Sequence, residues 1–248
     1  MKTVGHATSV AELLDVVTSG DDHPLACWYR GASDASYQLL PSAFRDGRSR
    51  DQESSLLHYF RAAAMSRSAE LPAADAHAPW LSLAQHWGLP TRLLDWSTSL
   101  LVATFFAVEL QTGERRDAAV WALNAFNMNE HFGNDRLQYA IDSHTAAKYV
   151  EPAFYFQHEE PGGYLGVLAL EHDRRIHAQQ GTFTIHSCRD CLEQSAGSER
   201  WLRKVVIPAG AVDRIRRELR VLGVSRSSLF PDLAALAAQI KADDLGIM

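Results

Sequence analysis

The chain has 248 residues, 46% of them hydrophobic and 22% charged, a composition typical of one large soluble globular domain. Its formal net charge of −6 excludes a surface that is basic throughout, so nucleic acid could contact only a local basic patch. Three cysteines, an N-terminus without a signal-peptide pattern and the lack of an apolar run of about 18 residues predict a cytoplasmic protein without membrane contact.

The first predicted element is a helix within residues 1–24, where Ser9 and Glu12 form a capping-box pattern and Gly20 stops the apolar periodicity. Apolar periodicity predicts the later helices, and short apolar runs predict the strands. The helices are expected at 52–68, 80–88, 100–110, 211–223 and 232–242, and the strands at 25–31, 118–124, 164–170, 181–186 and 204–208. The polar stretch 127–163 is predicted to be a flexible insert.

These strands come from widely separated parts of the chain and do not alternate regularly with helices. That order is typical of an α+β fold rather than of an all-β meander. No repeat or low-complexity tract divides the chain, so we expect a single domain that includes the helix at 1–24.

Arg30 is the first residue whose position points to chemistry, because it ends an apolar strand. A guanidinium that leaves a core strand is costly unless an anion meets it. A bound anion would make Arg30 functional, whereas a buried carboxylate such as Asp95 would make it structural. Gly31 allows either a ligand or another backbone to approach closely.

Polar groups crowd the start of an apolar helix in the segment QHWGLPTRLLDWSTSLLVATFFAVE, which begins at Gln85. Gln85 and His86 stand at the end of the preceding helix, where side chains can cap free carbonyls. Arg92 and Asp95 are three residues apart and could pair. The hydroxyls of 97–99 can cap the next helix or bind a phosphate at its N-terminus.

His186, Cys188 and Cys191 in HSCRDC are three potential zinc ligands, but a fourth is missing, so we expect no metal site. Neither GxGxxG nor GxxxxGK[ST] occurs, which removes support for a Rossmann site or a P-loop. HExxH and GxSxG are absent as well. The case for a function therefore depends on Arg30 and on the segment that begins at Gln85.

Several of these motifs together resemble the FRG domain family, which is named for its [F/Y]-R-G motif. They are Tyr29-Arg30-Gly31, LPSAFR at 40–45, the long segment from Gln85, RIHAQQGTFT at 175–184 and SLFPDL at 228–233. The long central segment is the most specific of them. On this resemblance, residues 25–248 are identified as an FRG domain.

The order of these elements is similar to that of the ADP-ribosyltransferase superfamily, which implies a mixed, split β-sheet core flanked by helices. In the R-S-E branch of that superfamily, the Arg holds an NAD phosphate or ribose, the STS element shapes the nicotinamide pocket and a final Glu hydrogen-bonds the ribose. Arg30 and the hydroxyls of 97–99 match the first two positions. At the third position, that branch has a Glu-x-Glu motif shortly before an apolar strand. In this chain the corresponding segment is ERWLRKVVIP, which has Lys204 in place of the second Glu.

This departure leaves the third role open. Glu199 could reach the site from upstream, or RIHAQQGTFT could supply Gln179, with Phe183 beside it. A neutral amide stabilises a cationic sugar less than a carboxylate does and cannot act as a base. Asp95 is then the substitute for acid–base or electrostatic work, unless Arg92 neutralises it.

The resemblance implies an NAD-dependent ADP-ribosyltransferase-like enzyme that modifies RNA or protein as a toxin or phage-defence effector, with an antitoxin or chaperone as a further partner. NAD is the expected substrate, and no metal is expected. The expected catalytic residues are Arg30, Asp95, Gln179 and Glu199. The expected NAD-binding residues are Tyr29, Arg30, Gly31, Gln85, His86, Thr91, Arg92, Ser97, Thr98, Ser99 and Phe183.

Two other interpretations compete with an enzyme. The missing Glu favours a non-catalytic module that binds a nucleotide or nucleic acid with the same polar cluster. Alternatively, Arg30, Arg92 and Asp95 form a buried network that holds the fold together. In that case Arg30→Ala would cost several kcal/mol of stability, because it leaves a buried charge unpaired.

Overall fold

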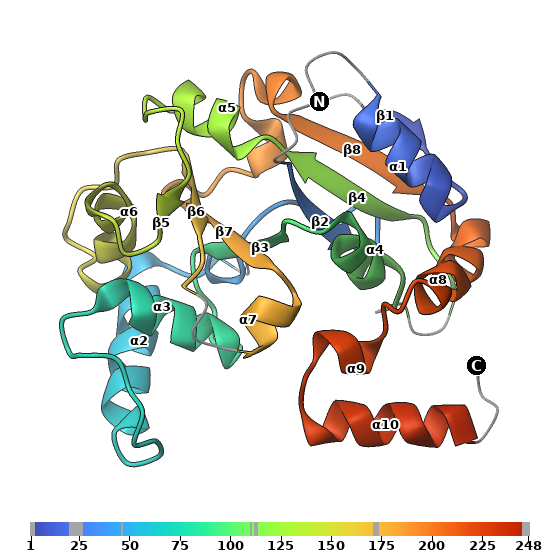
Figure 1. Cartoon of the computed structure of the whole chain (residues 1–248). Helices are drawn as coiled ribbons and strands as arrows, with labels where there is room; N and C mark the ends of the chain where they lie inside the picture. The colour runs from blue at the N-terminus through green and yellow to red at the C-terminus, as the bar shows by residue number, and fades with distance from the viewer. Residues whose placement is uncertain are drawn as a thin grey trace.

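A computed structural model describes residues 3–19, 27–45, 47–109, 111, 114–170 and 174–244. The strands form one mixed sheet with the order β1-β8-β4-β2-β3-β7-β6-β5 (Figure 1). The end pairs β1–β8 and β5–β6 are parallel, and the strands between them are antiparallel. The predicted α+β class is confirmed. The strands are β1 Thr3–His6, β2 Trp28–Ala32, β3 Leu93–Ser97, β4 Ala118–Leu123, β5 Tyr139–Ala140, β6 Tyr164–Leu168, β7 Gly181–His186 and β8 Leu202–Ile207.

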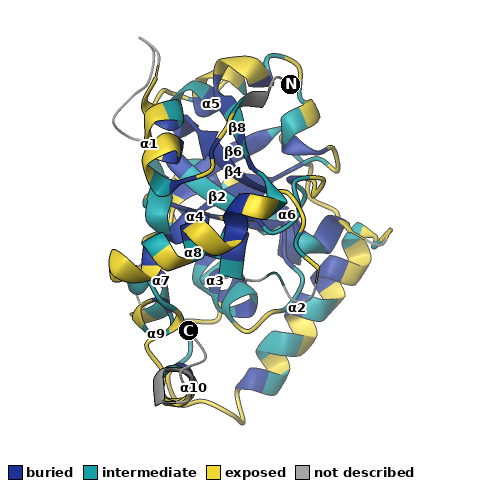
Figure 2. Cartoon of the chain, turned by 90° about the vertical axis from the view of Figure 1, so that its right-hand side faces the viewer, coloured by how far each residue is buried: buried dark blue, intermediate teal, exposed yellow. Residues whose placement is uncertain are grey.

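Helices cover both halves of one sheet face, α1, α4 and α8 against β4 and β8, and α2, α3 and α6 against β3, β6 and β7. The opposite face carries a cluster that includes Trp28, Trp96 and Trp121 and packs on α5. Figure 2 shows the strands buried beneath helices whose outer surfaces are exposed. The helices are α1 Val10–Thr18, α2 Arg50–Ala64, α3 His77–His86, α4 Leu100–Glu109, α5 Ala125–His131, α6 His144–Phe154, α7 Arg174–Ala178, α8 Val212–Val221, α9 Arg226–Leu229 and α10 Leu233–Asp244.

The sheet is divided at its centre, between β2 and β3. Strands β2 and β4, β3 and β7, and β4 and β8 pair over five or six residues each. In contrast, β2 meets β3 at a single pair, Tyr29 opposite Ser97. The sheet therefore consists of two halves, each with its own layer of helices. The candidate site forms where the halves separate.

Gly31 allows α4 to lie directly on β2. A Cβ at Gly31 would overlap the carbonyl oxygen of Ala103 and come within 2.5 Å of the backbone nitrogen of Ala107. Ala103 and Ala107 lie about one turn apart on α4, so their small side chains let the helix approach the strand. Of the two alternatives for Gly31, the structure therefore shows the close approach of another backbone.

Most predicted elements form within a few residues of their expected bounds. The Ser9 hydroxyl accepts a hydrogen bond from Glu12 N at 3.1 Å and caps α1 as predicted, whereas Gly20 lies outside the described residues. The strands β1, β3 and β5 and the helices α5, α6, α7 and α9 were not predicted from the sequence. Each of these strands has five residues or fewer, and such short apolar runs carry little periodicity.

The stretch 127–163 contributes to the core, although its composition is polar. It contains most of α5, all of β5 and α6, and the whole loop between α6 and β6. Tyr149, Val150 and Phe154 of α6 are buried against α3 and β7. The polar residues belong largely to exposed helix faces and turns. Within the described ranges, no helix combines the length and apolar character needed to cross a membrane.

Candidate functional site

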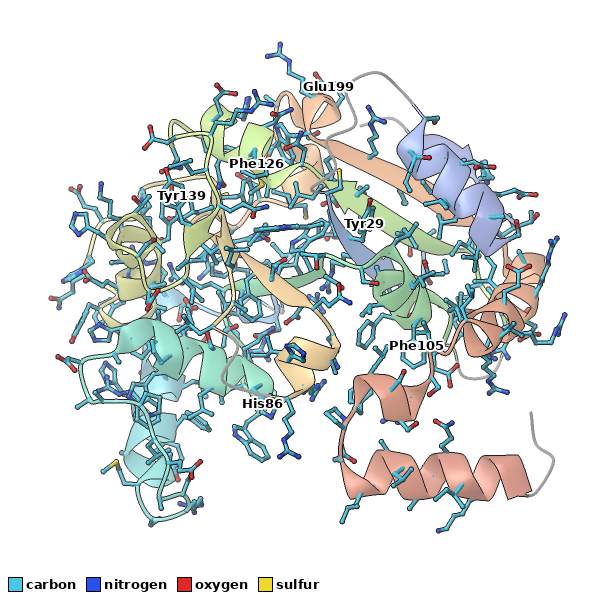
Figure 3. The ribbon with its side chains drawn as sticks, viewed as in Figure 1. Tyr29, His86, Phe105, Phe126, Tyr139 and Glu199 are labelled. Carbon is cyan, nitrogen blue, oxygen red and sulfur yellow. The ribbon has the colours of Figure 1, made fainter. Side chains whose placement is uncertain are left out.

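The separation of β2 from β3 opens a cavity of about 280 Å³, which we call the central cavity. Three strands (β2, β3 and β7) and three helices (α3, α4 and α7) line it. Figure 3 shows Tyr29 on β2 and His86 at the end of α3. The sequence-predicted residues that line the cavity are Tyr29, Arg30, Gly31, Gln85, His86, Asp95, Ser97, Gln179 and Phe183.

Arg30 spans the gap between the two halves of the sheet. Its Nη1 donates a hydrogen bond to the backbone carbonyl oxygen of Asp95 at 2.6 Å, while Asp95 Oδ2 lies 3.9 Å away. Burial lowers the pKa of Arg30, Asp95 opposes this effect and Arg45 adds to it, yet a guanidinium stays charged at neutral pH. Arg30 therefore joins β2 to β3 where the backbone ladder stops, and it brings positive charge to the cavity.

Asp95 supplies the carboxylate of the central cavity. Gln85 Nε2 donates to Asp95 Oδ2 at 2.9 Å and to Oδ1 at 3.1 Å. The buried Thr91 hydroxyl donates to Gln85 Oε1, which turns the NH₂ end of the amide toward Asp95. Because the Asp95 side chain is 56% exposed, a ligand can reach it. Thr91 lies behind Gln85 and not in the cavity wall, so it supports the site indirectly.

The hydroxyl residues at 97–99 have different tasks. Ser97 Oγ donates to the Gln179 carbonyl oxygen at 2.7 Å and accepts from Ser99 N at 3.0 Å. The Ser99 hydroxyl accepts from Val102 N at 3.4 Å and caps α4. Thr98 is exposed and donates to the side chain of Gln180 at 3.3 Å. Ser97 lines the cavity, whereas Thr98 and Ser99 lie outside its lining.

Arg92 does not pair with Asp95, although the two residues are only three positions apart in the sequence. Its fully buried guanidinium donates to both carboxylate oxygens of Glu53, at 2.7 and 3.1 Å, and to Glu160 Oε2 at 2.9 Å. Burial lowers the pKa of Arg92, but the two carboxylates outweigh that effect and raise it. Arg92, expected to bind NAD, does not line the central cavity, because residues distant in sequence enclose its side chain. Asp95 is therefore not occupied by Arg92 and faces the cavity.

The third position of the R-S-E pattern is not filled from β8. Glu199 is exposed in a 3-10 helix, Ser198–Arg200, and Figure 3 shows it at the opposite end of the molecule from His86. Lys204 stands opposite Trp121 of β4, which separates β8 from β2. Gln179 does line the cavity, but its Nε2 donates to Leu229 O at 3.1 Å. Asp95 is thus the candidate carboxylate that the fold brings to Arg30.

The cavity also contains side chains that the sequence analysis did not select. Arg175 brings a second guanidinium from α7, and Phe106 of α4 adds an aromatic wall. Ser82, Trp96 and Thr182 line it as well. Arg175 is the first residue of RIHAQQGTFT, so the motif contained a usable signal. Its meaning depended on α7 folding back over β3, which the sequence does not show.

The HSCRDC motif contains a buried histidine rather than a ligand cluster. Thr184 Oγ1 accepts a hydrogen bond from Trp96 Nε1 and is also hydrogen-bonded to His186 Nε2, each at 3.1 Å. His186 Nδ1 is buried and has no hydrogen-bond partner among the described residues. Cys188 and Cys191 are free thiols. In the part of the chain that the structure describes, no group of three or more His, Cys, Asp or Glu could hold a metal ion.

Lowering the pH from about 7 to about 5 should destabilise the protein through His186. Burial, followed by the positive charges of Arg30 and Arg92, lowers the pKa of His186 well below its usual 6.5. Below about pH 6.5 the unfolded chain takes up a proton that the folded chain does not. This contribution to the free energy of unfolding is therefore complete above that pH and falls by up to about 1.4 kcal/mol per pH unit below it.

Urea unfolding of the wild type and of His186→Gln at both pH values measures this effect. The wild type should lose more stability on acidification than the variant, because the variant has no imidazole to protonate. Equal losses would contradict a neutral, buried His186.

Comparison with protein families adds an independent observation. Residues 26–116 match the family model of the FRG domain. This part of the chain is similar to the FRG domain. The matched residues include β2, α2, α3, β3 and α4, and so supply Arg30, Gln85 and Asp95 to the central cavity. No curated protein and no solved structure matches the chain significantly.

The match confirms the FRG resemblance over residues 26–116, a shorter range than the predicted 25–248. The motifs at 175–184 and 228–233 lie outside it. The structure nevertheless brings the first of these motifs to the same cavity, since Arg175, Gln179 and Phe183 line it. The central cavity is therefore completed by residues beyond the matched range.

Proposed function

We propose that this protein binds NAD in the central cavity and transfers ADP-ribose to a macromolecule, either RNA or protein. The convergence of Arg30, Asp95, Ser97 and Gln179 on one cavity supports this function most directly. They come from β2, β3 and the turn after α7, and the sheet must divide to bring them together. We further propose a toxin or phage-defence setting, a cytoplasmic location and an antitoxin or chaperone partner. These three proposals rest on the family resemblance alone.

The lining of the cavity fits part of a dinucleotide. Its volume of about 280 Å³ is close to the lower limit of about 300 Å³ for ligand pockets, which suits a nucleoside-sized group. Arg30 and Arg175 can donate to phosphate oxygens, and Asp95 can accept from ribose hydroxyls. Burial raises the pKa of Tyr29 to about 12, so its hydroxyl stays protonated as a donor. Phe106 adds an apolar ring for a planar base.

Asp95 is the residue placed to take part in the reaction. During transfer, the bond between ribose C1′ and the nicotinamide nitrogen breaks, and nicotinamide leaves with both bonding electrons as a neutral base. C1′ then bonds to an oxygen or nitrogen of the acceptor, whose proton passes to the Asp95 carboxylate. The same carboxylate stabilises the positive charge that develops on the ribose. Gln85, oriented by Thr91, holds the carboxylate in one position.

Replacing Asp95 with asparagine should lower nicotinamide release from NAD by about 100-fold or more, because the amide neither carries charge nor accepts a proton. The free energy of unfolding should change little, since Asp95 is largely exposed. Nicotinamide release and transfer of labelled ADP-ribose to RNA and to protein in a cell lysate measure the activity. Glu199→Gln is the matched control, because it removes an exposed carboxylate outside the cavity and should leave activity unchanged.

Three other outcomes are informative. Wild-type protein that releases no nicotinamide and transfers no ADP-ribose is not the proposed enzyme. If Glu199→Gln loses activity while Asp95→Asn keeps it, the catalytic carboxylate is that of Glu199. NAD that raises the melting temperature without any chemistry would identify a nucleotide-binding module instead. The absence of β8 side chains from the cavity lining favours that second function.

A further inference from the structure

The SLFPDL motif at 228–233 has no place in the proposed chemistry, yet it lies directly behind one wall of the central cavity. That wall consists of α7 and the turn after it, which supply Arg175, Ile176 and Gln179 to the cavity lining. Figures 1 and 2 both show α9, in which the motif begins, beside α7. The motif follows Gln179 by about fifty residues of chain and lies outside the matched FRG range.

Phe230 contacts two separate walls of the cavity. Its ring lies 4.6 Å from the Arg175 guanidinium and 6.1 Å from the Phe106 ring of α4, measured between centroids for the ring pair. A second guanidinium, that of Arg226, lies 4.9 Å from the same ring. Beside these contacts, the carbonyl of Leu229 accepts the hydrogen bond from Gln179 Nε2. Phe230 itself is not part of the lining, so it acts on the cavity through Arg175 and Phe106.

Helix α7 needs such support because it is too short to hold itself in place. It has five residues, and Ile176 is its one buried residue. An isolated helix of this length is unstable in water, so packing determines its position. At its end, Gln180 adopts a φ of +47°, an uncommon conformation for a residue other than glycine. The Gln180 carbonyl accepts from Thr98 N at 3.0 Å, which ties this turn to the end of β3.

We propose that Phe230 is a positioning residue for the central cavity: it holds α7 in place and thereby sets the position of the Arg175 guanidinium for a phosphate group of the ligand. The identity of that ligand rests on the proposed function. The aromatic ring matters because its face attracts the cation of Arg175, which an aliphatic side chain of similar size does not. The C-terminal segment thus completes a site whose other residues come mainly from the FRG match.

Three variants distinguish the effect of the Phe230 ring from that of its apolar volume and from any general effect of changing the C-terminal segment. Phe230→Leu keeps apolar volume and removes the ring. Phe230→Tyr keeps the ring and is the conservative rescue. Leu233→Ala is the control, because Leu233 is exposed at the start of α10. Hydrogen exchange of the amides of Gln179 and Gln180, which donate within the α7 turn, reports on α7 without any ligand.

In Phe230→Leu, exchange at these amides should rise about tenfold and the Kd for NAD should weaken about tenfold. If the enzyme turns over, KM for NAD should rise while kcat changes little, since Arg175 serves binding and Asp95 serves the reaction. Phe230→Tyr and Leu233→Ala should behave like the wild type.

Unchanged exchange in Phe230→Leu would overturn the inference, and so would faster exchange with an unchanged Kd for NAD. Failure of Phe230→Tyr to restore slow exchange would show that the ring is not the supporting group. A wild type that does not bind NAD would defeat the proposed function alone, because the exchange measurement would still decide whether Phe230 positions α7.

Discussion

Replacing Arg92 with alanine is expected to lower the free energy of unfolding by about 3–5 kcal/mol, enough to remove much of the stability of a typical domain. The guanidinium is fully buried and binds Glu53, Glu160 and the Tyr149 carbonyl oxygen. Without it, the buried carboxylate of Glu53 loses its cation. Arg92→Lys should also destabilise, because an ammonium cannot pair with both oxygens of Glu53 in the same geometry.

Urea unfolding monitored by tryptophan fluorescence measures this loss. Arg214→Ala is the matched control, because Arg214 pairs with Glu218 at 2.9 Å on the surface of α8, and such a pair contributes about 0.3–0.5 kcal/mol. The double variant Arg92→Met, Glu53→Leu should recover most of the stability, because Glu160 keeps Arg50 at 3.1 Å. An Arg92→Ala protein as stable as Arg214→Ala would refute a buried ion network.

Replacing Gly31 with alanine should cost about 3 kcal/mol or more and prevent normal packing of α4 on β2. The added Cβ would overlap the Ala103 carbonyl oxygen and press on the backbone of Ala107. Neither atom is the end of a flexible side chain, so the helix must move away from the sheet as a whole. That movement would separate buried side chains of α4 from those of β4 and β8.

Gly210→Ala is the control for this change, because a Cβ there meets no atom within 4 Å. Thermal and urea unfolding of both variants should show a large loss for Gly31→Ala and almost none for Gly210→Ala. Similar stabilities would show that α4 can retreat from β2 without cost. In that case the glycine of the Tyr29-Arg30-Gly31 motif would need a different explanation.

The prediction of α4 shows which features local sequence can determine. The apolar run 100–110 and the hydroxyl before it predicted a helix with a capped start, and the structure has α4 at Leu100–Glu109 with Ser99 as its cap. The neighbouring strand β3 was missed, because five residues next to Pro90 carry too little periodicity. Its identity as a strand comes from pairing with β7, which lies nearly ninety residues away.

The candidate site was predicted less completely than the elements that carry it. Arg30, Gln85 and Asp95 were selected because polar groups beside apolar runs are costly, and all three line the central cavity. The sequence left open whether Arg92 pairs with Asp95, and only the structure brings the distant Glu53 to its guanidinium. Glu199 was selected by analogy, but the position of β8 beyond β4 keeps it out of the cavity.

The sequence by itself determined the α+β class, most of the longer helices and strands, and the polar residues that needed an explanation. These follow from periodicity, capping residues and the cost of burying polar groups, all of which act over a few residues. Only the tertiary structure decided that the sheet divides at Tyr29 and Ser97, that Arg92 belongs to the core, and that Arg175 lines the cavity with Phe230 packed against it. Those facts depend on contacts between residues far apart in the chain, and such contacts form only when the whole sheet and its helices pack together.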